Sequence, residues 1–179
     1  MAIFLIIISI LCWAASIWCL FARQIIAPAL SYLGLLLLSF AKVDVYPLLP
    51  INNVMLIGWL SMTVVVMIAT ILQPDRIVRQ TKGMAFIVIG GIVGLAVGLL
   101  GFTVESAALR YSIMIISVVA GIFFGFLLYS NTPDGQPVRI GSGNFFKYLL
   151  AKGFPTAITL MQPGVVLVLL ISIKNVNGL

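Results

Sequence analysis

Few residues in this chain could carry out chemistry. Its 179 residues include no histidine, two cysteines and four acidic residues, which are Asp44, Asp75, Glu105 and Asp134. Most metal sites and most acid–base catalysts need histidine or clustered carboxylates, and no two acids lie close together within one apolar segment. The sequence also has no phosphate-binding loop, nucleophile elbow, dinucleotide fingerprint or metalloprotease helix. We therefore expect a protein that is not an enzyme and that has no cofactor and no metal.

The first candidate site is Gln162-Pro163-Gly164, near the middle of the last apolar segment. Pro163 has no backbone N–H, so the carbonyl of Thr159 loses its helical hydrogen-bond partner. Broken helices with exposed carbonyls bind ions and small polar substrates in many transporters. Thr159, Gln162, Pro163 and Gly164 therefore form a possible substrate or ion site. The competing interpretation is a tolerated kink, with Gln162 hydrogen-bonded to a neighbouring helix.

The second candidate is a stripe of small residues on two neighbouring apolar segments. Residues spaced by four lie on one side of a helix, and small side chains there allow another backbone to approach closely. The stripe would pack within the chain as a hairpin, form a seam between subunits or with another protein, or line a substrate pathway. Its members are Gly90, Gly94 and Gly98 on one segment and Ser117, Gly121 and Gly125 on the next.

The third candidate is a set of basic residues in the connections. The net charge is +6 and the pI about 9.7, but the basic residues are thinly spread, and we expect no nucleic-acid partner. They are suited to anionic lipid headgroups or to a cytoplasmic partner, and the candidates are Arg76, Arg79, Lys82, Arg139, Lys147 and Lys152. At the opposite boundary, Glu105 and Arg110 are expected to form an ion pair that stabilises a turn.

The elements that carry these residues must lie in a membrane. Hydrophobic residues make up 63% of the chain and charged residues 8%, against about 25% charged in soluble domains. The composition excludes a soluble fold and predicts an all-α, polytopic transmembrane helix bundle in a single domain. A span needs about 20 apolar residues, and six are expected, near 3–21, 25–41, 52–72, 84–103, 110–129 and 155–173. Five is the alternative, if residues 3–41 form an irregular hairpin.

The distribution of basic residues predicts the orientation. With six spans, seven basic residues fall on one side, which the positive-inside rule makes cytoplasmic: Arg23, Arg76, Arg79, Lys82, Arg139, Lys147 and Lys152. Three fall on the other side: Lys42, Arg110 and Lys174. Both termini are then non-cytoplasmic, and the short loops favour a bacterial inner membrane. Residues 144–152 alternate aromatic residues and leucines with lysines, which is typical of an interfacial helix.

Two functions are consistent with this pattern. The first is a non-catalytic integral membrane subunit that scaffolds or stabilises a larger multi-protein membrane complex, because intramembrane charges, which usually mark transport, are almost absent. Its partners would be other integral membrane proteins and anionic lipids. The alternative is a small oligomeric transporter or channel for a neutral or lipid-like substrate that uses the broken sixth helix. A homo-oligomer is possible, and a self-contained homo-oligomer would favour the transporter or channel.

Overall fold

In a computed structural model of the chain, residues 2–43, 46–74, 77, 81–102 and 106–176 are described. Their main elements are α-helices: α1 (Ala2–Ala22), α2 (Ala27–Ser39), α3 (Asn53–Ile71), α5 (Met84–Leu100), α6 (Ala107–Ser130), α7 (Phe145–Tyr148) and α8 (Phe154–Val176). A 3₁₀ helix, η1 (Pro133–Val138), and one π-helical turn, η2 (Leu149–Gly153), lie between α6 and α8. Two short antiparallel strands, β1 (Lys42–Val43) and β2 (Tyr46–Pro47), pair Lys42 with Pro47 and Val43 with Tyr46.

Local sequence explains where several helices begin. Pro28 lies in the first turn of α2, where the missing N–H is not needed. Asn52 caps α3, because its side chain accepts hydrogen bonds from the backbone N–H groups of Val54 and Met55. Gly83 precedes α5 with φ = +82°, a left-handed conformation that glycine adopts without strain, and it packs against the ring of Tyr129.

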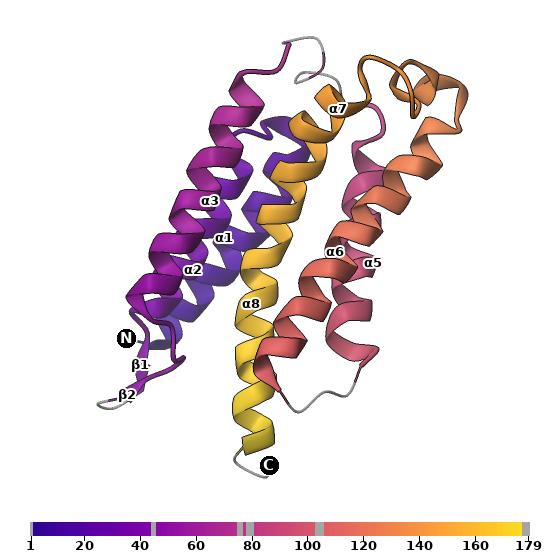
Figure 1. Cartoon of the computed structure of the whole chain (residues 1–179). Helices are drawn as coiled ribbons and strands as arrows, with labels where there is room; N and C mark the ends of the chain where they lie inside the picture. Colours follow the sequence, from indigo (N-terminus) through magenta and orange to yellow (C-terminus); the bar gives the residue numbers. More distant parts are fainter. Residues whose placement is uncertain (1, 44–45, 75–76, 78–80, 103–105, 177–179) are drawn as a thin grey trace.

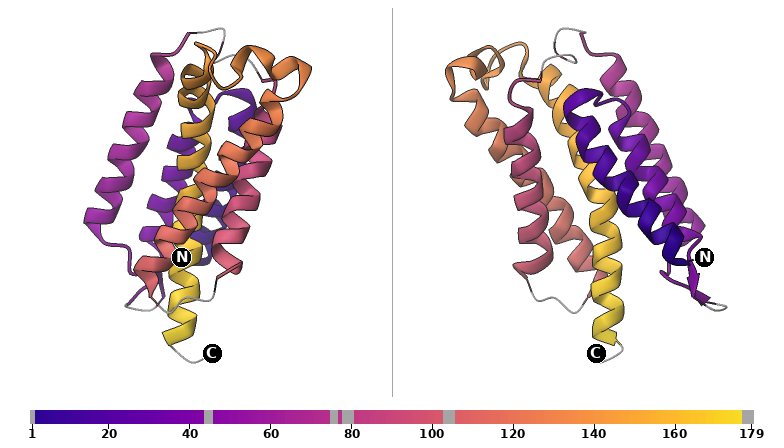
Figure 2. Two further views of the ribbon diagram at one scale, coloured as in Figure 1. Left: turned by 45° about the vertical axis from the view of Figure 1, so that its right-hand side comes forward. Right: turned by 180° about the vertical axis from the view of Figure 1, so that it is seen from behind.

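α8 is the central helix of the bundle. It packs against α1, α2, α3, α5 and α6, and Figures 1 and 2 show it between the α1–α3 group and the α5–α6 hairpin. In the segment Phe145–Ile173, 61% of the most apolar stretch is buried, compared with 17% in both α1 and α3. The two larger hydrophobic clusters both include α8: Leu160 and Val165 pack with α6, and Val166 packs with α2.

The structure supports a helical membrane bundle. Within the described residues, four apolar segments are long enough to cross a membrane: Ala2–Ala22, Asn53–Ile71, Ala107–Ser130 and Phe145–Ile173. α2 and α5 are apolar but shorter, and at 1.5 Å per residue they extend roughly 20 and 26 Å, less than the roughly 30 Å of a hydrocarbon core. The helix expected at 25–41 is shorter than predicted: α2 ends at Ser39, and the chain then enters β1 at Lys42.

The expected interfacial helix at 144–152 has a different structure. α7 and η2 continue directly into α8, so that Phe145–Ile173 forms one long apolar helical segment. The reason is that Phe145, Tyr148 and Ala151 are buried. The ring of Tyr148 stacks on Tyr129, and that of Phe145 packs edge-on against Phe126. These contacts hold the segment against α6 and in line with α8.

The long helices alternate in direction, so their connections gather at two ends of the bundle (Figures 1 and 2). The beginning of α1 and the end of α8 lie toward one end. The connections that follow α1, α3 and α6 lie at the other end, together with η1 and α7. Arg23, Lys82, Arg139 and Lys147 therefore share this end, and we call it the basic end of the bundle.

Candidate functional site

A polar cluster lies inside the bundle, where α8 faces α2 and α3. We define it as Ser31, Thr63, Thr159 and Gln162, whose exposed fractions are all 2% or less. The side-chain Nε2 of Gln162 donates a hydrogen bond to Oγ1 of Thr63 over 2.9 Å. Thr63 in turn donates its hydroxyl to the carbonyl of Trp59 one turn earlier, at 2.8 Å. Gln162 therefore ties the central helix to α3 through a polar contact within the apolar interior.

The structure compensates for Pro163 with a side chain from another helix. Pro163 cannot donate to the carbonyl of Thr159, four residues earlier. The hydroxyl of Ser31 on α2 donates to that carbonyl instead, at 2.9 Å. α8 continues as a helix from Phe154 to Val176, so the expected break is not present. The missing backbone bond is replaced by one between helices, as is typical of prolines in membrane helices.

Two polar atoms of this cluster have no hydrogen-bond partner. They are Oε1 of Gln162 and Oγ1 of Thr159, both on α8 and both buried. A buried polar atom without a partner is unfavourable by about 1–3 kcal/mol, and such atoms commonly bind water or a ligand. Both atoms are uncharged, so the cluster suits water or a neutral hydrogen-bonding group. Among the described residues, no three His, Cys, Asp or Glu side chains gather as metal ligands.

Gly164 does not belong to the polar cluster. A Cβ atom at this position would lie 2.7 Å from Leu95 of α5 and 2.9 Å from the sulfur of Met114 of α6. Gly164 thus allows α8 to approach the α5–α6 hairpin on a different side from Ser31. The structure brings Thr159 and Gln162 together with Ser31 and Thr63, and it places Gly164 in apolar packing.

The glycine stripe lies between α5 and α6. A Cβ atom at Gly90 or Gly94 would collide with the backbone carbonyl of Gly121 or Ser117, respectively. At Gly98 it would lie 2.8 Å from the Cα of Met114, and at Gly125 it would collide with the carbonyl of Phe86. Each of the six predicted small residues thus lies in this contact. Within this chain the stripe packs as a hairpin, which was one of the three alternatives.

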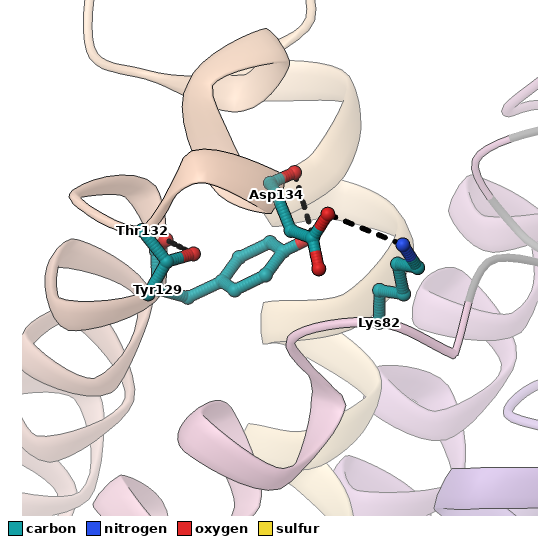
Figure 3. Close-up of polar contacts among 4 residues, drawn as sticks. All are labelled: Lys82, Tyr129, Thr132 and Asp134. Carbon is teal, nitrogen blue, oxygen red and sulfur yellow. Dashed lines mark hydrogen bonds and ion pairs between the residues drawn. The ribbon is translucent and has the colours of Figure 1, made fainter.

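At the basic end, polar contacts tie the connections to one another. Lys82 and Asp134 form an ion pair of 3.2 Å, and the hydroxyl of Tyr129 donates to the carbonyl of Asp134 at 3.2 Å (Figure 3). The hydroxyl of Tyr148 donates to the carbonyl of Lys82 at 2.8 Å. These bonds link the start of α5, the end of α6 and α7.

The predicted basic residues differ in exposure. Arg139 and Lys147 are exposed, as a headgroup contact requires. Lys152, expected at the same surface, is 0% exposed, because η2 continues the central helix and turns this side chain into the bundle. Arg76, Arg79 and Glu105 lie outside the described residues, so the predicted pair of Glu105 with Arg110 does too. Arg110 itself is buried near the start of α6.

Sequence reasoning missed Ser31 and Thr63. Each is a small polar residue on a mostly apolar helix, and such residues commonly form bonds between membrane helices. Their residue types were a usable signal. The sequence does not show that both residues face α8, because this contact depends on the central position of α8 in the bundle.

No protein-family model matches the chain, and no curated protein or solved structure is significantly similar to it.

Proposed function

We propose that the chain is a non-catalytic integral membrane subunit that scaffolds or stabilises a larger multi-protein membrane complex. In this proposal six helices cross a bacterial inner membrane, the basic end is cytoplasmic, and both termini are non-cytoplasmic. The partners are other integral membrane proteins.

The observation that carries the proposal is the exposure of α1 and α3. Only 17% of the most apolar stretch of each is buried. Large apolar side chains cover their outer faces, with Trp18 75%, Ile57 63% and Val65 60% exposed. Without a strong apolar driving force in lipid, membrane helices associate through shape and polar contacts. The exposed faces of α1 and α3 are long enough for helices of another protein to pack along them through such contacts.

The interior of the bundle supports the same proposal. The polar cluster uses Ser31 and Gln162 for bonds between helices, and the glycine stripe is occupied by the chain's own α5–α6 contact. A partner would thus bind the outer faces of α1 and α3 rather than the stripe. Replacing Gly94 or Gly98 by leucine would disrupt the hairpin itself, so these substitutions do not probe a partner interface.

Photo-crosslinking tests this proposal. A photoreactive phenylalanine analogue is placed at Trp18 or Ile57, with Val97 on the exposed side of α5 as the control. After irradiation of native membranes, we expect protein adducts of one defined mass at position 18 or 57 and none at 97. Extraction in mild detergent should retain the same protein in stoichiometric amount. A chain that purifies alone and gives no protein adduct at either position would contradict the proposal.

A second candidate function is transport of a neutral or lipid-like substrate. It is favoured by the two unpartnered atoms of the polar cluster, Oε1 of Gln162 and Oγ1 of Thr159. These atoms lie next to Pro163 on the helix that all the other long helices contact. A neutral polar group could bond to both of them.

Flux measurements separate the two candidates. Purified protein in liposomes is assayed for glycerol permeation and for transbilayer movement of a fluorescent phospholipid. Transport predicts that Gln162→Leu abolishes the flux, while Gln73→Leu, at the end of α3, leaves it unchanged. Flux at the level of protein-free liposomes would rule out both probes as substrates.

A further inference from the structure

An apolar groove opens on the outer surface between α6 and the start of the central helix. Its volume is about 530 Å³, and it is lined by Ile116, Ala120 and Phe123 of α6 and by Leu149, Gly153 and Ala157 of η2 and α8, among others. At 1.5 Å per residue, the stretches 115–123 and 149–157 each extend roughly 12 Å along the bundle. The groove therefore runs along the bundle, which is the direction in which lipid chains lie.

Small residues keep this groove open. Ala120, Gly153 and Ala157 line it between the larger side chains. A Cβ atom at Gly153 would lie 2.8 Å from Leu149 and 3.7 Å from Ile122. Gly153 also ends the π-helical turn η2, a widened turn that is often found at functional sites.

The groove lies on the lipid-facing surface and leads toward the basic end. Ile116 is 67% exposed, so one wall is open to the surroundings of the bundle. On the other wall, Phe146 and Lys147 precede Leu149 on the same continuous helical segment. Phe146 is 71% exposed and Lys147 is also exposed. Exposed aromatic and basic side chains at the end of an apolar segment are typical of the membrane interface.

Exposed cations gather at this end of the bundle. Asp134 is the only acidic residue among the described residues, and it already pairs with Lys82. Arg139 and Lys147, both exposed, belong to the same connection. Basic residues near a membrane surface attract anionic lipid headgroups.

We propose that this groove binds one acyl chain of an anionic phospholipid, whose headgroup phosphate lies at Lys147. The apolar lining and open wall accept the chain, and the exposed Lys147, two residues before the groove-lining Leu149, supplies charge complementarity. This site is independent of the proposed scaffold function, since it uses α6 and α8 rather than α1 and α3.

Lipid retention in native mass spectrometry tests the groove. The full-length protein is purified in mild detergent and incubated with phosphatidylglycerol or with phosphatidylcholine. We expect one retained phosphatidylglycerol per chain, bound in preference to phosphatidylcholine. Ala120→Phe fills the groove and should remove this retention, whereas the control Ala96→Phe, on the exposed side of α5 outside the groove, should not. Ala120→Leu serves if Ala120→Phe does not fold.

Charge variants test the headgroup contact. Lys147→Gln should weaken phosphatidylglycerol retention about fivefold, which corresponds to about 1 kcal/mol for one basic residue at an anionic surface. Retention of phosphatidylcholine should not change. Lys42→Gln is the control, because Lys42 is exposed at the opposite end of the bundle. Equal retention of both lipids, or unchanged retention in a folded Ala120 variant, would indicate adventitious surface lipid only and overturn the proposal.

Discussion

The hydrogen bond from Ser31 to the carbonyl of Thr159 allows a test of how the bundle tolerates Pro163. The bond is 2.9 Å long, and Ser31 is fully buried. Pro163 has no backbone N–H to donate to this carbonyl. Ser31→Ala removes the hydroxyl that donates to it from α2, so the carbonyl is left with neither donor. Pro163→Ala supplies a backbone N–H four residues after Thr159. The effect of Ser31→Ala should therefore depend on the residue at position 163.

The expected magnitudes follow from these contacts. Bonds between membrane helices contribute about 0.6 kcal/mol on average and at most about 1.7, and an unsatisfied buried carbonyl is unfavourable by about 1–3 kcal/mol. We expect Ser31→Ala to lower the free energy of unfolding by about 1–2 kcal/mol when Pro163 is present. In the Pro163→Ala background the loss should fall below about 0.5 kcal/mol. The coupling energy is then about 1 kcal/mol.

The assay is equilibrium unfolding in mixed micelles, with the fraction of denaturing detergent raised and helix content followed by circular dichroism. Ser172→Ala is the matched control. Its hydroxyl also bonds to a carbonyl of α8, that of Val168, at 2.8 Å, but no proline removes the helical donor there. The control should lose less than about 0.5 kcal/mol in both backgrounds. Equal losses for Ser31→Ala with and without Pro163 would refute the reasoning.

Three further predictions concern the packing of the helices and the basic end. Gly121→Leu should destabilise the protein by about 1–3 kcal/mol or more, because the new Cβ would lie 2.9 Å from the Cα of Gly94. Gly58→Leu should not destabilise the protein, because nothing lies within 4 Å of its Cβ position. The unfolding assay described above compares the two variants. Tyr148→Phe removes a bond of 2.8 Å and should lower stability by about 0.5–1.5 kcal/mol; a change below 0.3 kcal/mol would contradict this. Asp134→Asn breaks a surface ion pair and should lower stability by less than about 1 kcal/mol, with a smaller effect at 1 M salt than at 0.05 M.

The apolar helices could be predicted because the membrane imposes length and composition on each of them. The segments expected at 3–21, 52–72 and 110–129 correspond to Ala2–Ala22, Asn53–Ile71 and Ala107–Ser130. Asn52 directly precedes the apolar run of α3 and caps it, as asparagine commonly does at helix N-termini. The segments expected at 25–41 and 84–103 are shorter in the structure, where α2 is Ala27–Ser39 and α5 is Met84–Leu100. Hydropathy does not show at which residue a helix ends and a turn begins.

The arrangement of the helices could not be predicted in the same way. All the spans are strongly apolar, so hydropathy gives no sign that α8 lies in the centre. The burial of Lys152 follows from this central position, as does the contact of Gln162 with Thr63. The contact between the glycines of α5 and α6 was one expected alternative, because a short connection favours a hairpin. Choosing that alternative required the positions of the backbones.

The position of α8 has a consequence for biosynthesis. This helix follows the other long helices in the chain, yet it is the element that both groups pack against. Ribosomes synthesise about 5–20 residues per second, so α1–α3 and α5–α6 enter the membrane seconds before their common core. During that interval the nascent chain holds two helical groups that have no central helix to join them. Quality-control proteases and insertion chaperones would meet this protein in two unjoined parts, and its assembly would be completed only when α8 is inserted.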